Sequence, residues 1–281
     1  MIEGGDARAG VTTAARVVAI DGERRREIVD DLATEEPLEI RIVAAGRTQT
    51  LAVTMRTPGH DFELAAGFLF AEGLIRNPGD LAGISYCIDP GVDAEQRYNI
   101  VNVHLTAPVD RLDRFERHFI TSSACGVCGK ANVDALATRA PKIEDETRVS
   151  AALLAQLPGK MREAQRVFAS TGGLHAAALF DCDGNLLALR EDVGRHNALD
   201  KILGWSILGA RPAPSGCILL VSGRASFELA QKSIVARIPV LCAVSAPSSL
   251  AVSLAEAFDL TLVGFVRGER ANVYAAPRRI V

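Results

Sequence analysis

The sequence has few aromatic residues, little net charge and no long apolar run, and each shortage excludes a class of protein. Aromatic residues make up 5% of the 281 residues, so aliphatic side chains must form the core. The formal net charge is −3, which provides no basic field for nucleic acid. No uninterrupted apolar run approaches the ~20 residues that a membrane helix needs. We therefore expect a soluble globular protein that contacts neither nucleic acid nor membrane.

Two nucleotide-binding motifs and a secretion signal are also missing. Neither Gly-x-x-x-x-Gly-Lys-Ser/Thr nor Gly-x-Gly-x-x-Gly occurs, which argues against an ordinary ATPase or a dinucleotide-dependent dehydrogenase. Residues 1–10 carry acids and glycines in place of an apolar signal core. This composition predicts a cytoplasmic protein, in which cysteines stay reduced.

The segment richest in chemistry is the cysteine pair Cys125 and Cys128, within the sequence TSSACGVCGK. Small residues and glycines of this kind cannot pack a core, but they let the chain bend toward different partners. Lys130 lies close enough in sequence to favour a thiolate, which is the form of cysteine that attacks or carries sulfur. We interpret the segment as a mobile loop with reactive thiols.

Three other interpretations of the pair stay open: half of a structural zinc site, a thioredoxin-type redox pair and a structural disulfide. Zinc needs two more ligands, and the remaining cysteines are scattered singly. A thioredoxin-type motif opens a helix after a strand, whereas this pair follows a charged segment. Of the remaining cysteines, Cys87, Cys182, Cys217 and Cys242, we expect Cys182 in a turn and Cys217 and Cys242 in apolar strands.

The first half of the chain has an α+β pattern. Alternating apolar residues predict a β-hairpin over 38–43 and 51–55, and helical spacing predicts a helix over 60–72 that ends at Gly73. The first ~40 residues mix charges of both signs, so we expect a solvated, partly flexible lead-in. Further strands are predicted over 84–88 and 98–105, and a charged helix over 110–118. The hairpin residues expected to face the core are Leu38, Ile40, Ile42, Leu51, Val53 and Met55.

The second half alternates apolar strands with helices, which predicts a parallel sheet covered on both faces. A helical region capped by Ser150 is expected to break near Pro158 and Gly159. A hairpin over 174–180 and 185–190 follows, and then come strands over 217–221, 240–244 and 260–265 and helices over 197–205, 227–236 and 248–257. The domain prediction is an N-terminal α+β subdomain over 1–120, a mobile CxxC loop and linker over 121–145, and an α/β sheet domain over 146–281.

Three polar loops follow the predicted strands, at the ends where α/β sheets bind ligands. They are residues 222–226, 245–249 and 266–270. Backbone amides at helix starts, together with Arg224, suit a phosphate group. Phe265 can stack on a ring while neighbouring arginines hold phosphate oxygens. Together the loops indicate a phosphorylated, nucleotide-like ligand.

A second polar cluster, residues 191–197, has the sequence EDVGRHN. Two interpretations stay open: a ligand-binding group that includes Arg195 and His196, or a helix-capping network in which Asp192 or Asn197 is the cap. His175 could line the same pocket, or it could be a buried, hydrogen-bonded strand residue.

Six segments, in order along the chain, resemble the FdhD family of formate dehydrogenase accessory sulfurtransferases. They are residues 125–130, 170–175, 191–201, 222–226, 245–249 and 262–268. The resemblance covers the chain from about Val11 to its C-terminus, and the combination of motifs is highly specific.

The resemblance implies a sulfur carrier. A cysteine desulfurase would place sulfur on Cys125 as a persulfide, and Cys128 would assist its transfer or release. The acceptor would be the molybdenum or tungsten cofactor with two pyranopterin guanine dinucleotides (Mo-bis-MGD), bound as a substrate and later inserted into formate dehydrogenase. A GDP-like nucleotide would mimic it. The residues assigned to its site are Phe265, Val266, Arg267, Gly268, Glu269, Arg270, Ser222, Gly223, Arg224, Arg195 and His196.

The same resemblance implies a homodimer whose C-terminal half is similar to cytidine deaminases. Deaminases bind zinc through His-x-Glu and Pro-Cys-x-x-Cys. Here His175 is followed by two alanines and no proline precedes Cys125, so we expect no zinc. A cofactor chaperone without sulfur chemistry and a zinc-dependent deaminase remain as alternatives.

Overall fold

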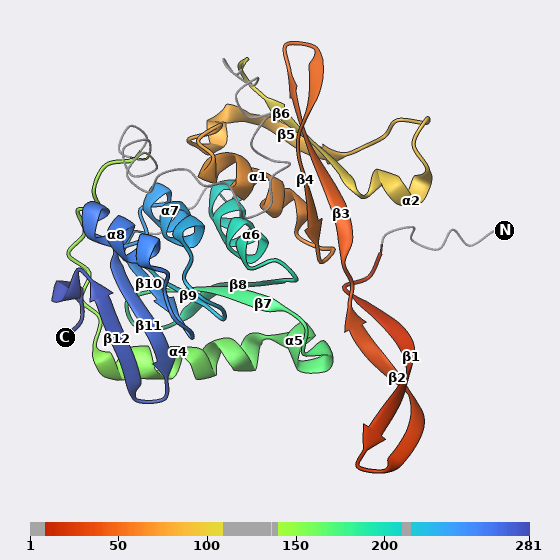
Figure 1. Ribbon diagram of the computed structural model, residues 1–281. Helices are drawn as coiled ribbons and strands as arrows, with labels where there is room; N and C mark the ends of the chain where they lie inside the picture. The colour runs from red at the N-terminus through yellow and green to blue at the C-terminus, as the bar shows by residue number, and fades with distance from the viewer. Residues whose placement is uncertain (1–8, 109–135, 137–139, 210–214) are drawn as a thin grey trace.

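The computed structural model describes residues 9–108, 136, 140–209 and 215–281, which form three sheets with their covering helices (Figure 1). The first sheet is a two-stranded ribbon of β1 (Thr12–Asp21) and β2 (Arg24–Ala33), joined by a tight turn at Gly22 (φ +60°). It projects from the body of the molecule and is mostly exposed. The expectation of a partly flexible lead-in missed this ribbon, because the charged sequence RRREIVDDLA of β2 hides the strand pattern.

The second sheet has the strand order β4-β3-β6-β5 and is covered by α1 (Asp61–Ala71). The predicted hairpin is confirmed, but Val53 and Met55 are 58% and 47% exposed, so the inward orientation expected for them was wrong. A β-bulge is the cause: Ile40 pairs with Ala52 while Arg41 pairs with Thr50, which leaves one extra residue in β4 and reverses its alternation. The elements are β3 (Glu36–Ala44), β4 (Arg47–Arg56), β5 (Leu81–Tyr86), β6 (Ile100–Leu105), η1 (Pro78–Asp80) and α2 (Ala94–Arg97).

The third sheet has six strands in the order β12-β11-β10-β9-β7-β8. Strands β9, β10 and β11 are parallel to one another, as predicted, and the hairpin predicted over 174–180 and 185–190 is confirmed as the antiparallel pair β7–β8. The prediction of a parallel sheet was wrong at the other edge, where β12 pairs antiparallel with β11. Strand β12 was not predicted and turns the segment after β11 into a hairpin. The strands are β7 (His175–Phe180), β8 (Leu186–Asp192), β9 (Ile218–Val221), β10 (Val240–Ala243), β11 (Thr261–Arg267) and β12 (Arg270–Ala275).

Helices cover both faces of this sheet, as predicted (Figure 1). One face packs against α4 (Ala151–Ala164), which is followed by α5 (Arg166–Thr171). The other face packs against α6 (Arg195–Leu208), α7 (Phe227–Val235) and α8 (Ser249–Phe258). The chain ends in a short turn, η3 (Pro277–Arg279).

Helix α4 begins at the predicted cap, where the Ser150 hydroxyl accepts a hydrogen bond from Leu153 N. The predicted break near Pro158 was wrong, because α4 continues through this proline to Ala164. An internal proline costs about 3 kcal/mol or more. Burial of Leu154, Leu157 and Met161 against the sheet offsets that cost.

A very close crossing of α1 and α6 joins the second and third sheets. A Cβ atom on Gly67 would lie 1.8 Å from Asp200 O, and one on Gly204 would lie 1.8 Å from Glu63 O. Both glycines are therefore required for the two helix backbones to touch. The contact fixes the N-terminal sheet against the sheet that carries the polar loops.

The described residues contain no helix long and apolar enough to span a membrane. The predicted domain limits depend partly on residues 109–135, outside the described part of the chain, and stay predictions.

Candidate functional site

Three loops meet at the sheet edge where the parallel strands β9, β10 and β11 end. Ser248 N, after β10, donates a hydrogen bond to Ala225 O, after β9 (2.9 Å). Phe265 N, in β11, donates to Ser245 O, after β10 (3.2 Å). The polar segments identified in the sequence therefore lie side by side, as neighbouring parallel strand ends require.

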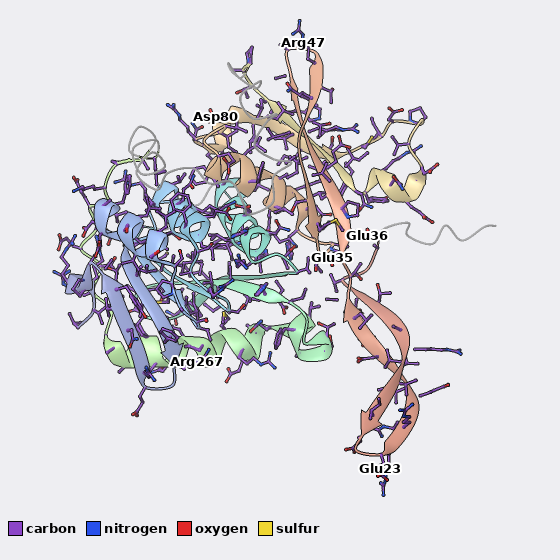
Figure 2. All side chains as sticks on the ribbon, viewed as in Figure 1. Glu23, Glu35, Glu36, Arg47, Asp80 and Arg267 are labelled. Atoms are coloured by element: carbon purple, nitrogen blue, oxygen red, sulfur yellow. The ribbon has the colours of Figure 1, made fainter. Side chains whose placement is uncertain are left out.

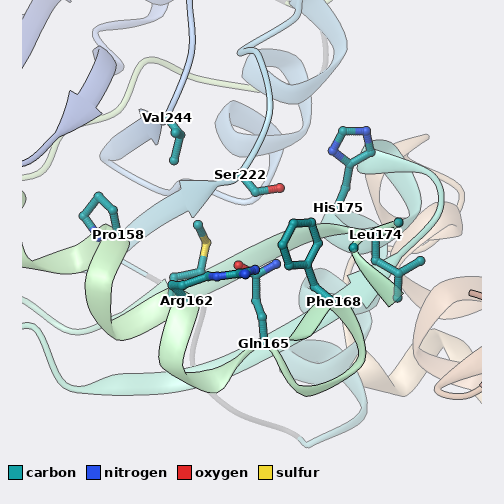
Figure 3. A pocket seen from close by; sticks show the side chains of 11 residues that line it. Pro158, Arg162, Gln165, Phe168, Leu174, His175, Ser222 and Val244 are labelled. Atoms are coloured by element: carbon teal, nitrogen blue, oxygen red, sulfur yellow. The ribbon is translucent and has the colours of Figure 1, made fainter. Parts of the chain in front are cut away.

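A cavity of about 580 Å³ opens beside this edge, between the helix pair α4–α5 and the ends of β9 and β10 (Figure 3). Arg162, Gln165 and Phe168 form the wall on the helix side, while Ser222 and Val244 form the wall on the sheet side. His175 closes one end. The volume lies within the range of small-molecule and cofactor sites.

The helix wall combines an aromatic ring with a cation. The Arg162 guanidinium lies 4.2 Å from the centroid of the Phe168 ring, which is a cation–π arrangement. Glu191 of β8 holds this wall in place, because its carboxylate accepts hydrogen bonds from Val167 N (3.0 Å) and Phe168 N (2.7 Å) at the start of α5. A flat aromatic surface beside an arginine can receive a ring that carries negative charge.

The sheet side of the cavity is built from Ser222, His175 and Gly223. The Ser222 hydroxyl accepts a hydrogen bond from Ala176 N (2.9 Å), which fixes it at the cavity wall. A Cβ atom on Gly223 would lie 3.5 Å from His175 Nδ1 and 3.9 Å from Arg195 Cδ, so this glycine lies between the two side chains. Burial lowers the pKa of His175, and the positive charges of Arg195 and His196 lower it further.

Arg195 and His196 begin α6 at the same sheet edge. Arg195 Nε is buried without a hydrogen-bond partner among the described residues. His196 Nε2 lies 3.2 Å from Ser226 Oγ and 2.8 Å from a Glu228 carboxylate oxygen. The hydrogen bond from His196 lowers the pKa of Glu228, although partial burial opposes the shift.

The rest of the 191–197 cluster is structural. The buried Asp192 carboxylate accepts hydrogen bonds from Thr57 N, Gly194 N and Asn197 Nδ2, and it pairs with Lys201 Nζ at 2.7 Å. Asn197 does not cap α6; its amide instead donates to Met55 O (2.7 Å). These side chains join α6 to the end of β4. The capping interpretation was wrong, because Gly194 is the N-cap of α6 and no side chain caps it; the buried residues form a network between the sheets instead. The ligand-binding interpretation of Arg195 and His196 stays a prediction.

The segment from Phe265 to Arg270 differs from the predicted strand-end loop, because it forms the turn of the β11–β12 hairpin. Val266 is fully buried in the core beside α4, so its side chain is not available to a ligand. Arg267, labelled in Figure 2, donates from Nε to Val244 O at the cavity wall (3.0 Å). Gly268 (φ +52°) makes the turn, and Glu269 and Arg270 are exposed at its tip, as Arg224 is on the neighbouring loop.

The structure does not place the predicted sulfur residues, because Cys125 and Cys128 lie outside the described part of the chain. Burial raises the pKa of Cys217 to about 11 and that of Cys242 to about 12, so neither thiol ionises readily. Cys182 is exposed in the β7–β8 turn, as expected. Within the described ranges, no three His, Cys, Asp or Glu side chains form a metal-binding group.

The sequence pattern did not identify Arg162, Gln165 and Phe168. They belong to a helical region whose apolar spacing indicated only packing on the sheet, and they reach the site because α4 crosses the sheet toward its strand ends. The one available signal was the pair of glycines after α5, Gly172 and Gly173, which line the same cavity.

A family model described as the FdhD/NarQ family matches residues 33–281 of the chain. Two curated relatives are named sulfur carrier protein FdhD. The relative from Mycolicibacterium paratuberculosis is 51% identical, with 96% of this chain and 99% of that protein covered. The relative from Streptomyces coelicolor is 52% identical, with 96% of each covered. A crystal structure of a protein assigned as a formate dehydrogenase accessory protein from Desulfotalea psychrophila has a TM-score of 0.74 and 25% identity, and the match covers 97% of this chain and 100% of that one.

Proposed function

The chain belongs to the FdhD/NarQ family, and we propose on that basis that it is a sulfur carrier protein required for formate dehydrogenase activity. It acts as a sulfurtransferase that receives sulfur as a cysteine persulfide and passes it to Mo-bis-MGD. The observation that carries the proposal is the cavity between α4–α5 and the strand ends, which offers an aromatic surface and cations on a protein with a slight negative charge.

The cavity suits one guanine nucleotide end of this substrate. A base can stack on the Phe168 ring, which lies at the wall with one face near Arg162. Phosphate groups would lie toward the strand-end edge, where α6, α7 and α8 all begin and where helix N-termini favour anions. Arg195, beside Gly223, and Arg267, bonded to Val244 O, lie at this edge and could contact such phosphates, and Arg224 and Arg270 are exposed on the adjoining loop and turn.

The sulfur steps require a dithiol, which Cys125 and Cys128 supply. The Cys125 thiolate attacks the outer sulfur of the desulfurase persulfide, forms a new S–S bond and releases the thiolate of the donor. The Cys128 thiolate then attacks the inner sulfur of the Cys125 persulfide. This releases sulfide for the metal and leaves a Cys125–Cys128 disulfide, which a cellular dithiol reduces. Electrons balance, because the two thiols are oxidised as the outer sulfur is reduced.

The partners in this proposal are a cysteine desulfurase as donor and the catalytic subunit of formate dehydrogenase as recipient of the sulfurated cofactor. The protein works in the cytoplasm as a homodimer and holds no zinc. Similarity of its six-stranded sheet to cytidine deaminases stays a prediction, as does the choice between molybdenum and tungsten.

The test replaces Cys125 by alanine and compares it with Cys182→Ala, which removes an exposed thiol in the β7–β8 turn. In a strain lacking the native protein, Cys125→Ala should abolish formate dehydrogenase activity while GDP binding is retained. Cys182→Ala should leave both unchanged. Mass spectrometry after incubation with a desulfurase should detect one added sulfur atom on Cys125.

Full formate dehydrogenase activity with Cys125→Ala would exclude the persulfide role and favour a chaperone that only delivers the cofactor. Failure of GDP to bind the unchanged protein would instead exclude the nucleotide site in the cavity. Stoichiometric zinc in the purified protein would support the deaminase-like alternative.

A further inference from the structure

One polar side chain in the cavity wall is buried and yet has an open amide group. Gln165 is 4% exposed and lines the cavity together with Arg162 and Phe168, and Figure 3 shows its amide directed into that space. No residue in the described part of the chain forms a hydrogen bond with this amide. Buried polar side chains are normally hydrogen-bonded, so an open amide that faces a cavity indicates a ligand group.

The local structure explains why the amide is open. Gln165 stands at the N-cap of α5, where a side chain often accepts hydrogen bonds from the first free backbone N–H groups of the helix. In this helix Glu191 of β8 occupies those groups, since it accepts from Val167 N and Phe168 N. The Gln165 amide is therefore not used by the helix and is left for the cavity.

A side-chain amide presents a donor and an acceptor side by side. Nε2 donates and Oε1 accepts, so the group matches a planar ring edge on which a carbonyl stands next to an N–H. Guanine carries such a lactam edge at O6 and N1–H, and a pterin ring carries the same edge. Adenine has the opposite order, because its amino group donates and its N1 accepts.

Arg162 determines which way round the amide lies. It belongs to the same wall, one helical turn before Gln165, and its guanidinium has N–H donors and a positive charge but no acceptor. The charge favours Oε1 on the Arg162 side and Nε2 on the other side. With the phosphates held toward the strand-end edge, an adenine ring would require this orientation to be reversed, whereas a lactam edge would not.

We propose that Gln165 determines the specificity of the cavity for a lactam edge: Nε2 donates to the ring carbonyl, and Oε1 accepts from the adjacent ring N–H. The inference rests on the proposed function, which places a guanine nucleotide end of Mo-bis-MGD in this cavity. The pyranopterin of the same substrate is a second source of the same edge. A ring without that edge leaves the buried amide unpaired, which is how a polar site rejects a close analogue.

Gln165→Met tests this assignment in the full chain, because methionine keeps the length of the side chain and removes both polar atoms. Gln156→Met is the matched control, since Gln156 is exposed on α4 and does not line the cavity. Isothermal titration calorimetry measures the dissociation constants for GDP, inosine diphosphate and ADP. GDP and inosine diphosphate share the lactam edge, and the unchanged chain should bind both about tenfold more tightly than ADP.

Gln165→Met should weaken the binding of GDP and inosine diphosphate by about tenfold and leave that of ADP unchanged, so that the preference is lost. Gln156→Met should bind all three as the unchanged chain does. Equal losses for GDP and ADP in Gln165→Met would overturn the assignment, because they would report a change in the shape of the cavity. Unchanged affinity for GDP in that variant would overturn it as well.

Titration with 6-hydroxymethylpterin separates the two sources of the edge, and it also separates this inference from the proposed function. If the pterin bound the unchanged chain, lost about tenfold in affinity with Gln165→Met, and GDP did not bind, the lactam assignment would stand. The nucleotide would then be excluded from the cavity. If GDP, inosine diphosphate and the pterin all failed to bind the unchanged chain, both the assignment and the nucleotide site would be overturned.

Discussion

At the residue scale, Phe168 is the side chain whose role in the cavity is the most direct to measure. Its ring faces the cavity while Arg162 lies over it. Stacking of a base on an aromatic ring contributes about 1–3 kcal/mol. Replacement by leucine keeps an apolar side chain but removes the flat ring. We therefore expect Phe168→Leu to weaken GDP binding by about tenfold, measured by isothermal titration calorimetry.

Phe168→Tyr is the matched control, because it keeps the ring, and its affinity for GDP should stay close to that of the unchanged protein. Equal affinities for leucine and tyrosine at this position would show that the base does not stack there. The nucleotide would then have to bind elsewhere along the strand-end edge.

The site could be predicted from sequence only where its residues are neighbours in the chain. Ser222, Gly223 and Arg195 stand in short polar segments beside predicted strands, so a local pattern was sufficient to find them. Phe168 and Arg162 have no such pattern, because they meet the site through the packing of α4 and α5 across the sheet. Val266 shows the reverse error. It stands in a motif-like segment, but its side chain points into the core.

At the element scale, the crossing of α1 and α6 depends on glycine at both contact positions. A methyl group on Gly204 would overlap the Glu63 backbone, and backbone atoms cannot move aside as a flexible side chain can. We expect Gly204→Ala to reduce the free energy of unfolding by about 3 kcal/mol or more, measured by urea denaturation.

Gly159→Ala provides the comparison within another helix. Gly159 lies in α4 with open space around its Cβ position, so alanine there should stabilise the protein by about 0.5–1 kcal/mol. Equal effects of the two substitutions would contradict the close crossing.

Most elements of the second half followed from the sequence because apolar strands and amphipathic helices alternate there with clear turns. The failures have separate physical causes. The bulge in β4 turns the side chains of Val53 and Met55 toward solvent. Both residues are apolar, so the hydrophobic pattern of the sequence still placed them in the core. Pro158 stays inside α4 because the helix packs on the sheet both before the proline, through Leu154 and Leu157, and after it, through Met161. Such tertiary effects override local preference.

At the scale of the whole molecule, Glu63 links the two large sheets. It lies on α1 and accepts hydrogen bonds from Arg190 of β8, including Nη2 to Oε1 at 2.7 Å. Burial alone would raise the pKa of Glu63. Hydrogen bonds and charge from Arg190 and His60 outweigh burial and hold the pKa below its ordinary value.

A lowered pKa in the folded state means that the unfolded chain binds the proton more tightly. The stabilisation from Glu63 is therefore complete above the unfolded carboxyl pKa of about 4.3, and it is lost as pH falls through the folded value. At about pH 7, Glu63→Gln should lower the free energy of unfolding by about 1–2 kcal/mol, because Arg190 loses its charged partner. The difference between the two proteins should shrink as the pH falls through the folded pKa of Glu63, where the carboxyl group of the unchanged protein becomes protonated as well.

Glu256→Gln, on the exposed side of α8, gives the baseline for losing one carboxylate from the whole protein. Its unfolding free energy should follow that of the unchanged chain at every pH, because Glu256 does not bridge the sheets. If Glu63→Gln showed the same pH profile as Glu256→Gln, the bond between α1 and β8 would contribute nothing specific. The α1–α6 glycine crossing would then be what holds the N-terminal sheet against the sheet that carries the cavity.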